Sequence, residues 1–323
     1  MTHSRVETFP AAAGRDVVNL LLRVVAAAVV VVALVALVRQ VDWHALMEVL
    51  GRTDAGWITA SLVVFLLPLL GNVLSLRAAA PVSLPWRLTA VAQLAGAFGN
   101  LVTPANIGGM ATNVRFLRGR GVPVADAAGV VGATQVMALL VTVAVAVPGL
   151  ASSGSAADAV RSAGSMLSAP VVVGVVVVLL GVAVLLGLTS WGRRTGRMLV
   201  SACAAFRLSL ASPARVFAAV AGSLLVNLGS AAALATAVRA FGGAVPFGDL
   251  VLVVALGGLL AGAVPVPGGV GVAELVLAAQ LTAVGLEPPV ALAAAVLYRL
   301  VTFWSRIPVG WLAFSWMRRS GHL

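Results

Sequence analysis

Uncharged apolar runs recur along this chain, and several reach the roughly 18 to 25 residues that a helix needs to cross a ~30 Å hydrocarbon core. Of its 323 residues, 61% are hydrophobic and only 10% are charged. A water-soluble fold has no interior large enough to hide that much apolar surface. The sequence therefore predicts an all-α, polytopic membrane protein.

Proline, glycine and arginine divide the apolar sequence into two kinds of segment. Two regions, 89–118 and 250–282, each hold two short apolar stretches separated by Pro and Gly, a pattern that favours re-entrant helical hairpins. If the hairpins are instead counted as spans, the chain has eight transmembrane helices, without symmetry. The six full spans are predicted at 20–38, 56–76, 126–150, 169–190, 216–238 and 289–311.

All 21 basic residues are arginine, and their distribution predicts the orientation. With a cytoplasmic N-terminus and hairpins that return to their starting side, fifteen arginines fall inside and four outside. The acidic residues lean to the outside. We expect a cytoplasmic (inner) cell membrane location, cytoplasmic tails at 1–19 and 317–323, and an uncleaved first helix.

The same orientation gives the transmembrane domain, 20–316, an internal symmetry. Segments 20–150 and 169–316 each run span, span, hairpin, span, and the two halves have opposite orientation. Transporters use such inverted repeats with broken helices to build a substrate site near the middle of the membrane.

The second hairpin contains the sharpest motif, AVPVPGGVGVAEL. Pro265 and Pro267 end the first limb, and Gly268, Gly269 and Gly271 permit a tight reversal. We expect the second limb to begin at about Gly269, with its free amides offering a site for an anionic group such as a lipid phosphate.

Glu274 lies one to two turns into this second limb. A charge at the centre of a bilayer costs roughly 2.5–3.5 kcal/mol, so the carboxylate needs a partner or a wet cavity. One interpretation is that it stabilises the positive end of the helix. The other is that it pairs with Arg299 or Arg306 and lines a substrate or proton path.

The first hairpin contains FGNLVTPANIGGMATNVRFLRGRG. A proline breaks the helix, a glycine pair allows close packing, and two asparagines offer amides to free backbone groups or to a ligand. An arginine in the second limb is a candidate phosphate ligand. These candidates are Asn100, Pro104, Asn106, Gly108, Gly109 and Arg115.

Three features together resemble the lysylphosphatidylglycerol synthase transmembrane region family: the P-x-P-G-G-x-G-x-x-E block at 265–274, Tyr298-Arg299, and the N-x-x-x-P-x-x-x-G block at 100–108. The resemblance covers about 20–316. It implies a flippase-like membrane domain with two re-entrant elements that moves lipids or lipid-linked groups between leaflets.

We therefore expect a flippase-like transporter of an anionic phospholipid or a polyprenyl-phosphate-linked lipid. The chain lacks the soluble aminoacyltransferase domain of the catalytic members, so we expect no enzymatic activity, no cofactor and no metal. The expected partners are membrane lipids with anionic headgroups, not nucleic acid; the sequence leaves the oligomeric state open. The alternative is a non-catalytic partner of an envelope glycosyltransferase or lipid-modifying enzyme, docked through the arginine-rich loop 193–215.

Overall fold

A computed structural model describes residues 43–51, 53–103, 107–152, 212–263 and 269–321. The chain divides into two compact units, Met1–Val41 and Asp42–Leu323, and every described residue belongs to the second. The expected spans at 20–38 and 169–190 lie outside the described residues. The described helices are α2 (Trp43–Gly51), α3 (Ala55–Val64), α4 (Leu66–Ala79), α5 (Trp86–Val102), α6 (Ile107–Arg118), α7 (Val124–Ser152), α11 (Pro213–Ala240), α12 (Phe247–Ala263), α13 (Val272–Ala283), α14 (Pro288–Arg299), the π-helical η3 (Leu300–Trp304) and α15 (Arg306–Arg319).

Four of the described helices are long and apolar enough to cross a membrane: Ala55–Ala79, Val124–Ala146, Pro213–Ala240 and Pro288–Arg319. They coincide with the predicted spans at 56–76, 126–150, 216–238 and 289–311. Large apolar side chains lie on their outer surfaces, and Phe217, for example, is 75% exposed. Apolar surface of this kind is stable in lipid and unstable in water. The all-α membrane fold predicted from the sequence is confirmed.

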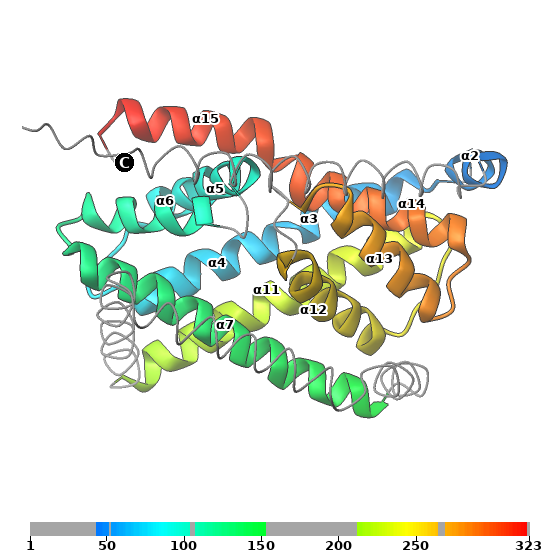
Figure 1. The fold of residues 1–323 in the computed structure, drawn as a ribbon, viewed down its shortest axis with the longest axis horizontal. Coiled ribbons are helices and arrows are strands. Elements are labelled where there is room, and N and C mark those ends of the chain that lie inside the picture. The colour runs from blue at the N-terminus through cyan, green and yellow to red at the C-terminus, as the bar shows by residue number, and fades with distance from the viewer. Residues whose placement is uncertain (1–42, 52, 104–106, 153–211, 264–268, 322–323) are drawn as a thin grey trace, which may run out of the picture. The chain divides into compact units, whose positions relative to one another are not determined.

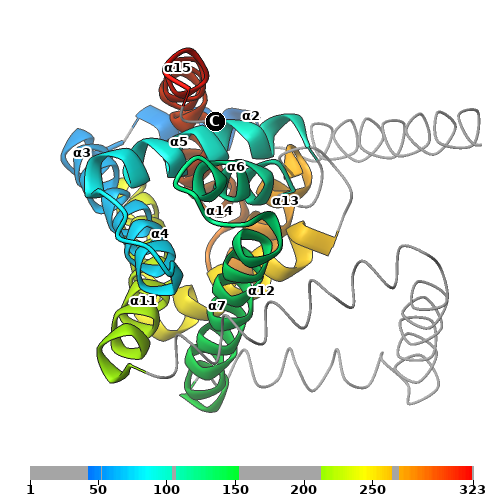
Figure 2. The ribbon, with the colours of Figure 1, turned by 90° about the vertical axis from the view of Figure 1, so that its left-hand side faces the viewer.

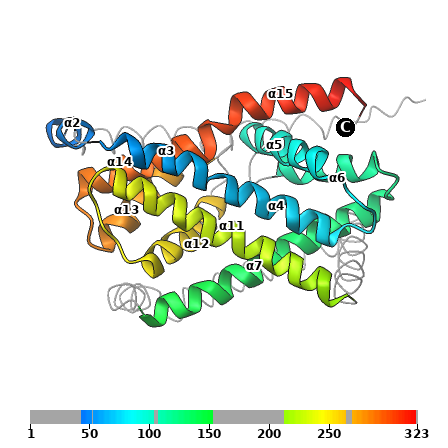
Figure 3. The same ribbon diagram turned by 180° about the vertical axis from the view of Figure 1, so that it is seen from behind.

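The centre of the fold is an antiparallel crossing of α4 and α11 (Figure 3). Contacts run in opposite directions along the two helices, from Pro68 with Gly229 to Ser75 with Gly222. At the crossing, a Cβ on Gly71 would lie 2.5 Å from the Gly222 carbonyl oxygen, and a Cβ on Gly222 would lie 2.8 Å from that of Gly71. Glycine is therefore required on both helices for their backbones to approach this closely.

Each of these two helices is followed by a helical hairpin (Figure 1). In both hairpins the first limb, α5 or α12, has 17 residues and the second, α6 or α13, has 12. A 12-residue helix is about 18 Å long, too short to cross the hydrocarbon core. Because α4 and α11 are antiparallel, the hairpins that follow them begin at opposite ends of the fold.

The packing of the hairpins is reciprocal. The first limb α5 packs against the last helix of the second half, α15, and the first limb α12 packs against the last helix of the first half, α7. Figure 2 shows α5 directly below α15 at the top of the view, with α7 at the bottom. A hydrophobic cluster forms around each hairpin, one including Phe116 and Met317 and the other including Leu250 and Leu281. This exchange of contacts is what an inverted repeat requires.

The last transmembrane helix differs from the prediction of a span ending at 311, since it continues to Arg319. It also contains the π-helical turn η3, in which the Ser305 amide donates to the Leu300 carbonyl at 2.9 Å. Pro308 follows closely and has no amide hydrogen to donate to Trp304, which favours a local departure from α-helical bonding. Arg299 and Arg306 therefore flank a π turn instead of lying on a regular helix.

The expected start of the second limb at Gly269 is wrong. Gly269 and Gly271 adopt positive φ values of 62° and 82°, which a right-handed helix cannot contain, and α13 begins at Val272. The motif AVPVPGGVG is thus a longer turn than the sequence indicated, and the carboxylate of Glu274 is brought into the first turn of α13.

Candidate functional site

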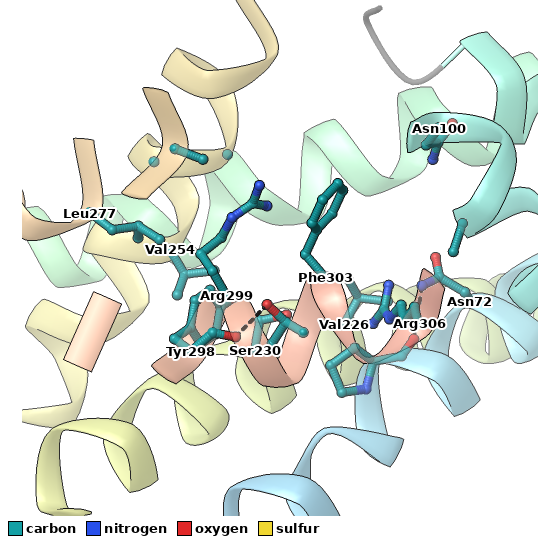
Figure 4. Close-up of a pocket in the computed structure, with 16 residues that line it drawn as sticks. Asn72, Asn100, Val226, Ser230, Val254, Leu277, Tyr298, Arg299, Phe303 and Arg306 are labelled. Atoms are coloured by element: carbon teal, nitrogen blue, oxygen red, sulfur yellow. Dashed lines mark hydrogen bonds between the residues drawn. The ribbon is translucent and has the colours of Figure 1, made fainter. Parts of the chain in front are cut away.

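A cavity of about 350 Å³ lies where both hairpins meet the central helices (Figure 4). Helices α4 and α11 contribute Asn72 and Ser230, the first hairpin contributes Ala97 and Asn100, and the second contributes the small residues Gly257, Gly258 and Ala273. The last helix supplies the remaining polar lining, namely Tyr298, Arg299, Thr302 and Arg306. The cavity is thus built by both halves of the chain.

Glu274 forms an ion pair with Arg299. The Arg299 Nε donates to the Glu274 Oε1 at 2.9 Å, and the side chains of Arg299 and Glu274 are only 12% and 14% exposed, respectively. The other carboxylate oxygen, Oε2, accepts from the Gly271 amide at 2.8 Å. Glu274 therefore stabilises the start of α13 and also takes Arg299, not Arg306, as its partner, while it does not itself line the cavity.

This arrangement changes the location expected for an anion. The positive end of α13 was a candidate phosphate site, but the chain's own carboxylate lies there. At the first hairpin, the Gly108 amide donates to the Thr103 Oγ1 at 2.7 Å and the Gly109 amide donates to the Asn100 Oδ1 at 2.6 Å. In both hairpins, side chains of the same hairpin thus accept from backbone amides at the start of the second limb.

Because Glu274 neutralises Arg299, Arg306 is the positively charged group of the cavity lining that can bind a ligand. Its guanidinium lies over the ring of Phe65, with the Cζ 4.2 Å from the ring centroid, and its Nε is buried without a hydrogen-bond partner. Figure 4 shows it close to Asn72 on the cavity wall. A buried guanidinium donor without an acceptor is costly, so this position favours a bound anion.

The remaining polar groups of the lining carry no charge. The hydroxyl groups of Tyr298 and Ser230 are hydrogen-bonded to each other across α14 and α11 (Figure 4). Asn72 donates from Nδ2 to the Pro68 carbonyl oxygen at 2.9 Å, which leaves its Oδ1 as an acceptor. Within the described part of the chain, no group of three or more His, Cys, Asp or Glu residues is suited to hold a metal ion.

The structure brings only some of the predicted site residues to the cavity. Asn100, Tyr298, Arg299 and Arg306 line it, and Glu274 lies behind Arg299. Gly108 and Gly109 instead pack against Gly99 and Asn100 within the first hairpin. Gly269 and Gly271 form the turn before α13, and Arg115 is exposed on α6, away from the lining. Pro104, Asn106, Pro265, Pro267 and Gly268 lie outside the described residues, as does all of the arginine-rich loop 193–215 except its end.

Sequence reasoning missed Asn72 and Ser230, which lie within predicted spans. Polar residues inside a membrane helix are a recognised signal of a functional site, and that signal was available here. Phe65 was also missed, since nothing in the sequence connects it with Arg306, 241 positions away.

An antiparallel pair of half-domains, each with a broken helical hairpin, and a polar cavity between them define a class of multi-pass membrane protein built from inverted repeats. Sequence comparison assigns the family within that class. Residues 22–310 match the Lysylphosphatidylglycerol synthase TM region, and the chain belongs to this family. No curated protein matched the chain in sequence.

Proposed function

We propose that this protein is a flippase-like transporter that moves an anionic lipid between the leaflets of the cytoplasmic membrane. The observation that carries the proposal is the buried Nε of Arg306, which has no hydrogen-bond partner and faces a cavity walled by both hairpins. A lipid phosphate is the acceptor that a guanidinium in a membrane interior fits best.

Two further features support transport over static binding. The hairpins start from opposite ends of the fold, and described residues of both hairpins line one cavity, so a movement of either hairpin changes the cavity wall. The π turn η3 separates the two arginines of the last helix, and such turns inside α-helices are frequent at functional sites. The proposal assigns no catalytic residue.

The test is a lipid-transport assay in proteoliposomes. Phosphatidylglycerol labelled on an acyl chain with a fluorophore is placed in both leaflets, and dithionite then quenches the outer leaflet only. We expect vesicles containing the protein to lose the protected inner-leaflet fluorescence, whereas protein-free vesicles keep it.

Arg306→Gln removes the charge and keeps a polar side chain, and we expect the rate of lipid movement to fall by about tenfold, because a hydrogen bond to a charged group is lost. Arg239→Gln is the matched control, since Arg239 is exposed at the end of α11 and does not line the cavity. Equal rates of lipid movement for both variants would show that Arg306 has no role in transport.

The same preparation tests the alternative role. If no lipid moves and an envelope enzyme co-purifies in a stoichiometric amount, the role of a non-catalytic partner replaces the transport proposal.

A further inference from the structure

The charge balance of the cavity restricts the headgroup that it can hold. Two guanidinium groups line the cavity, and the carboxylate of Glu274 neutralises Arg299. The hydroxyl of Tyr298 is uncharged at neutral pH. The sequences that join the limbs of each hairpin, TPAN and VPVPGGVG, contain no ionisable side chain. The described lining therefore carries one excess positive charge, located on Arg306.

One excess charge in a low-dielectric site matches one negative charge on the ligand. A phosphodiester has one ionised oxygen pair, which the planar guanidinium can bind with two parallel hydrogen bonds. A diphosphate or a fully ionised phosphomonoester would bring at least one further charge, and a buried charge without a partner is strongly disfavoured.

The neutral groups of the lining restrict the rest of the headgroup. The ammonium of a zwitterionic or cationic lipid needs a carboxylate, but among the described lining residues there is no Asp or Glu, and both oxygens of the nearby Glu274 are already bonded. Asn72, Ser230, Tyr298 and Thr302 instead offer hydroxyl and amide groups, which pair with the hydroxyl groups of a glycerol or a sugar.

We infer that the cavity, in the transport function proposed above, selects lipids whose head is a single phosphodiester monoanion bearing an uncharged, hydroxyl-rich substituent. The phosphodiester binds the Arg306 guanidinium, and the hydroxyl groups bind the uncharged lining. Two kinds of lipid share this chemistry, namely phosphatidylglycerol and a hexose linked through one phosphate to a polyprenol.

The test measures binding and transport separately, on the full-length protein. For binding, the protein in detergent is incubated with an equimolar mixture of phosphatidylglycerol, a polyprenyl phosphohexose, phosphatidic acid, phosphatidylcholine and a polyprenyl diphosphate, and retained lipids are counted by native mass spectrometry. For transport, fluorescent forms of the same lipids are used in the dithionite assay. The ratio of retained phosphatidylglycerol to retained polyprenyl phosphohexose shows which source of the headgroup the cavity prefers.

We expect phosphatidylglycerol, the polyprenyl phosphohexose or both to be retained at least about tenfold better than the other three lipids. Arg306→Gln should abolish this preference, Arg306→Lys should restore part of it, and Arg239→Gln should leave it unchanged. Glu274→Gln raises the excess charge of the cavity by one, so we expect it to shift retention severalfold from phosphatidylglycerol towards phosphatidic acid.

Selective retention without transport would support the inference and reject the proposed function. Transport of all lipids at equal rates, with no selective retention, would support the function and overturn the inference. A preference for phosphatidic acid, the diphosphate or phosphatidylcholine in the unmodified protein would also overturn it. Each Arg306 variant is compared with the unmodified protein by size-exclusion profile and thermal unfolding, so that lost folding is not mistaken for lost selectivity.

Discussion

Glu274 and Arg299 show how a charged residue is accommodated in the interior of this membrane protein. The carboxylate accepts from the Arg299 guanidinium and from the Gly271 amide, so both of its oxygens are bonded. The guanidinium in turn lies 4.2 Å from the centroid of the Phe303 ring. Such a pair contributes little net stability, but removing one member leaves the other buried without compensation.

We therefore predict that Glu274→Ala destabilises the protein by about 3–5 kcal/mol, because it removes the carboxylate that neutralises the Arg299 charge. The double variant Glu274→Ala with Arg299→Ala should lose less than the sum of the two single variants. Unfolding followed in detergent measures all three. Additive losses would indicate that the two side chains do not interact in the folded protein.

Asn100 has a comparable role in the first hairpin, since its Oδ1 accepts from the Gly109 amide across the break in the helix. Asn100→Leu removes this acceptor and leaves a backbone donor unpaired, at a cost of about 1–3 kcal/mol. We expect faster hydrogen exchange at the amides of residues 108 and 109, with unchanged exchange in α15 as the internal control. Unchanged exchange at both amides would mean that another group supplies the acceptor.

At the scale of helices, the crossing of α4 and α11 sets the geometry of the fold. The backbones touch at Gly71 and Gly222, and each half of the chain contributes one of these glycines. The two hairpins are then held at opposite ends of the crossing, each against the last helix of the other half. A change at the crossing is therefore expected to affect both hairpins together.

Gly222→Ala tests this crossing. Its Cβ would lie 2.5 Å from the Ser75 Oγ and 2.8 Å from the Gly71 carbonyl oxygen, so the helices must move apart, at a cost of about 1–3 kcal/mol. Gly258→Ala is the matched control, since a Cβ on this helical glycine meets no atom within 4 Å. We expect a lower unfolding temperature for Gly222→Ala alone. A similar loss for both variants would show that the effect arises from helix propensity or lipid contact.

At the scale of the whole described unit, charge separates along the long helices. Arg77, Arg87 and Arg318 lie at the end from which the first hairpin begins, whereas Asp54, Asp249 and Glu287 lie at the end from which the second begins. The excess of arginine predicts that the first of these ends is cytoplasmic.

Cysteine labelling tests this orientation. Ser83→Cys and Glu287→Cys are each introduced into a Cys203→Ala background, because both positions are exposed in loops at opposite ends. In intact cells we expect a membrane-impermeant maleimide to label position 287 and not position 83, and to label both after permeabilisation. The reverse pattern would invert the assigned orientation, and labelling of both in intact cells would contradict two separate faces.

The sequence alone determined the fold class, the spans that the structure describes, and the two hairpins. These properties follow from local features: the length of an apolar run sets what can cross a bilayer, and Pro and Gly mark where a helix must break. The importance of Glu274 was also evident, because an isolated acid in apolar sequence requires a partner.

Only the tertiary structure decided which partner Glu274 takes, and that Arg306 instead lies against Phe65 and faces the cavity. It also decided that a carboxylate and hairpin side chains, not a ligand, accept from the amides at the hairpin breaks. The π turn between the two arginines and the positive φ angles before α13 change the register by a few residues, which is enough to alter where a side chain points. Contacts between residues far apart in sequence depend on this register and on helix packing, and neither is encoded in the composition of any single segment.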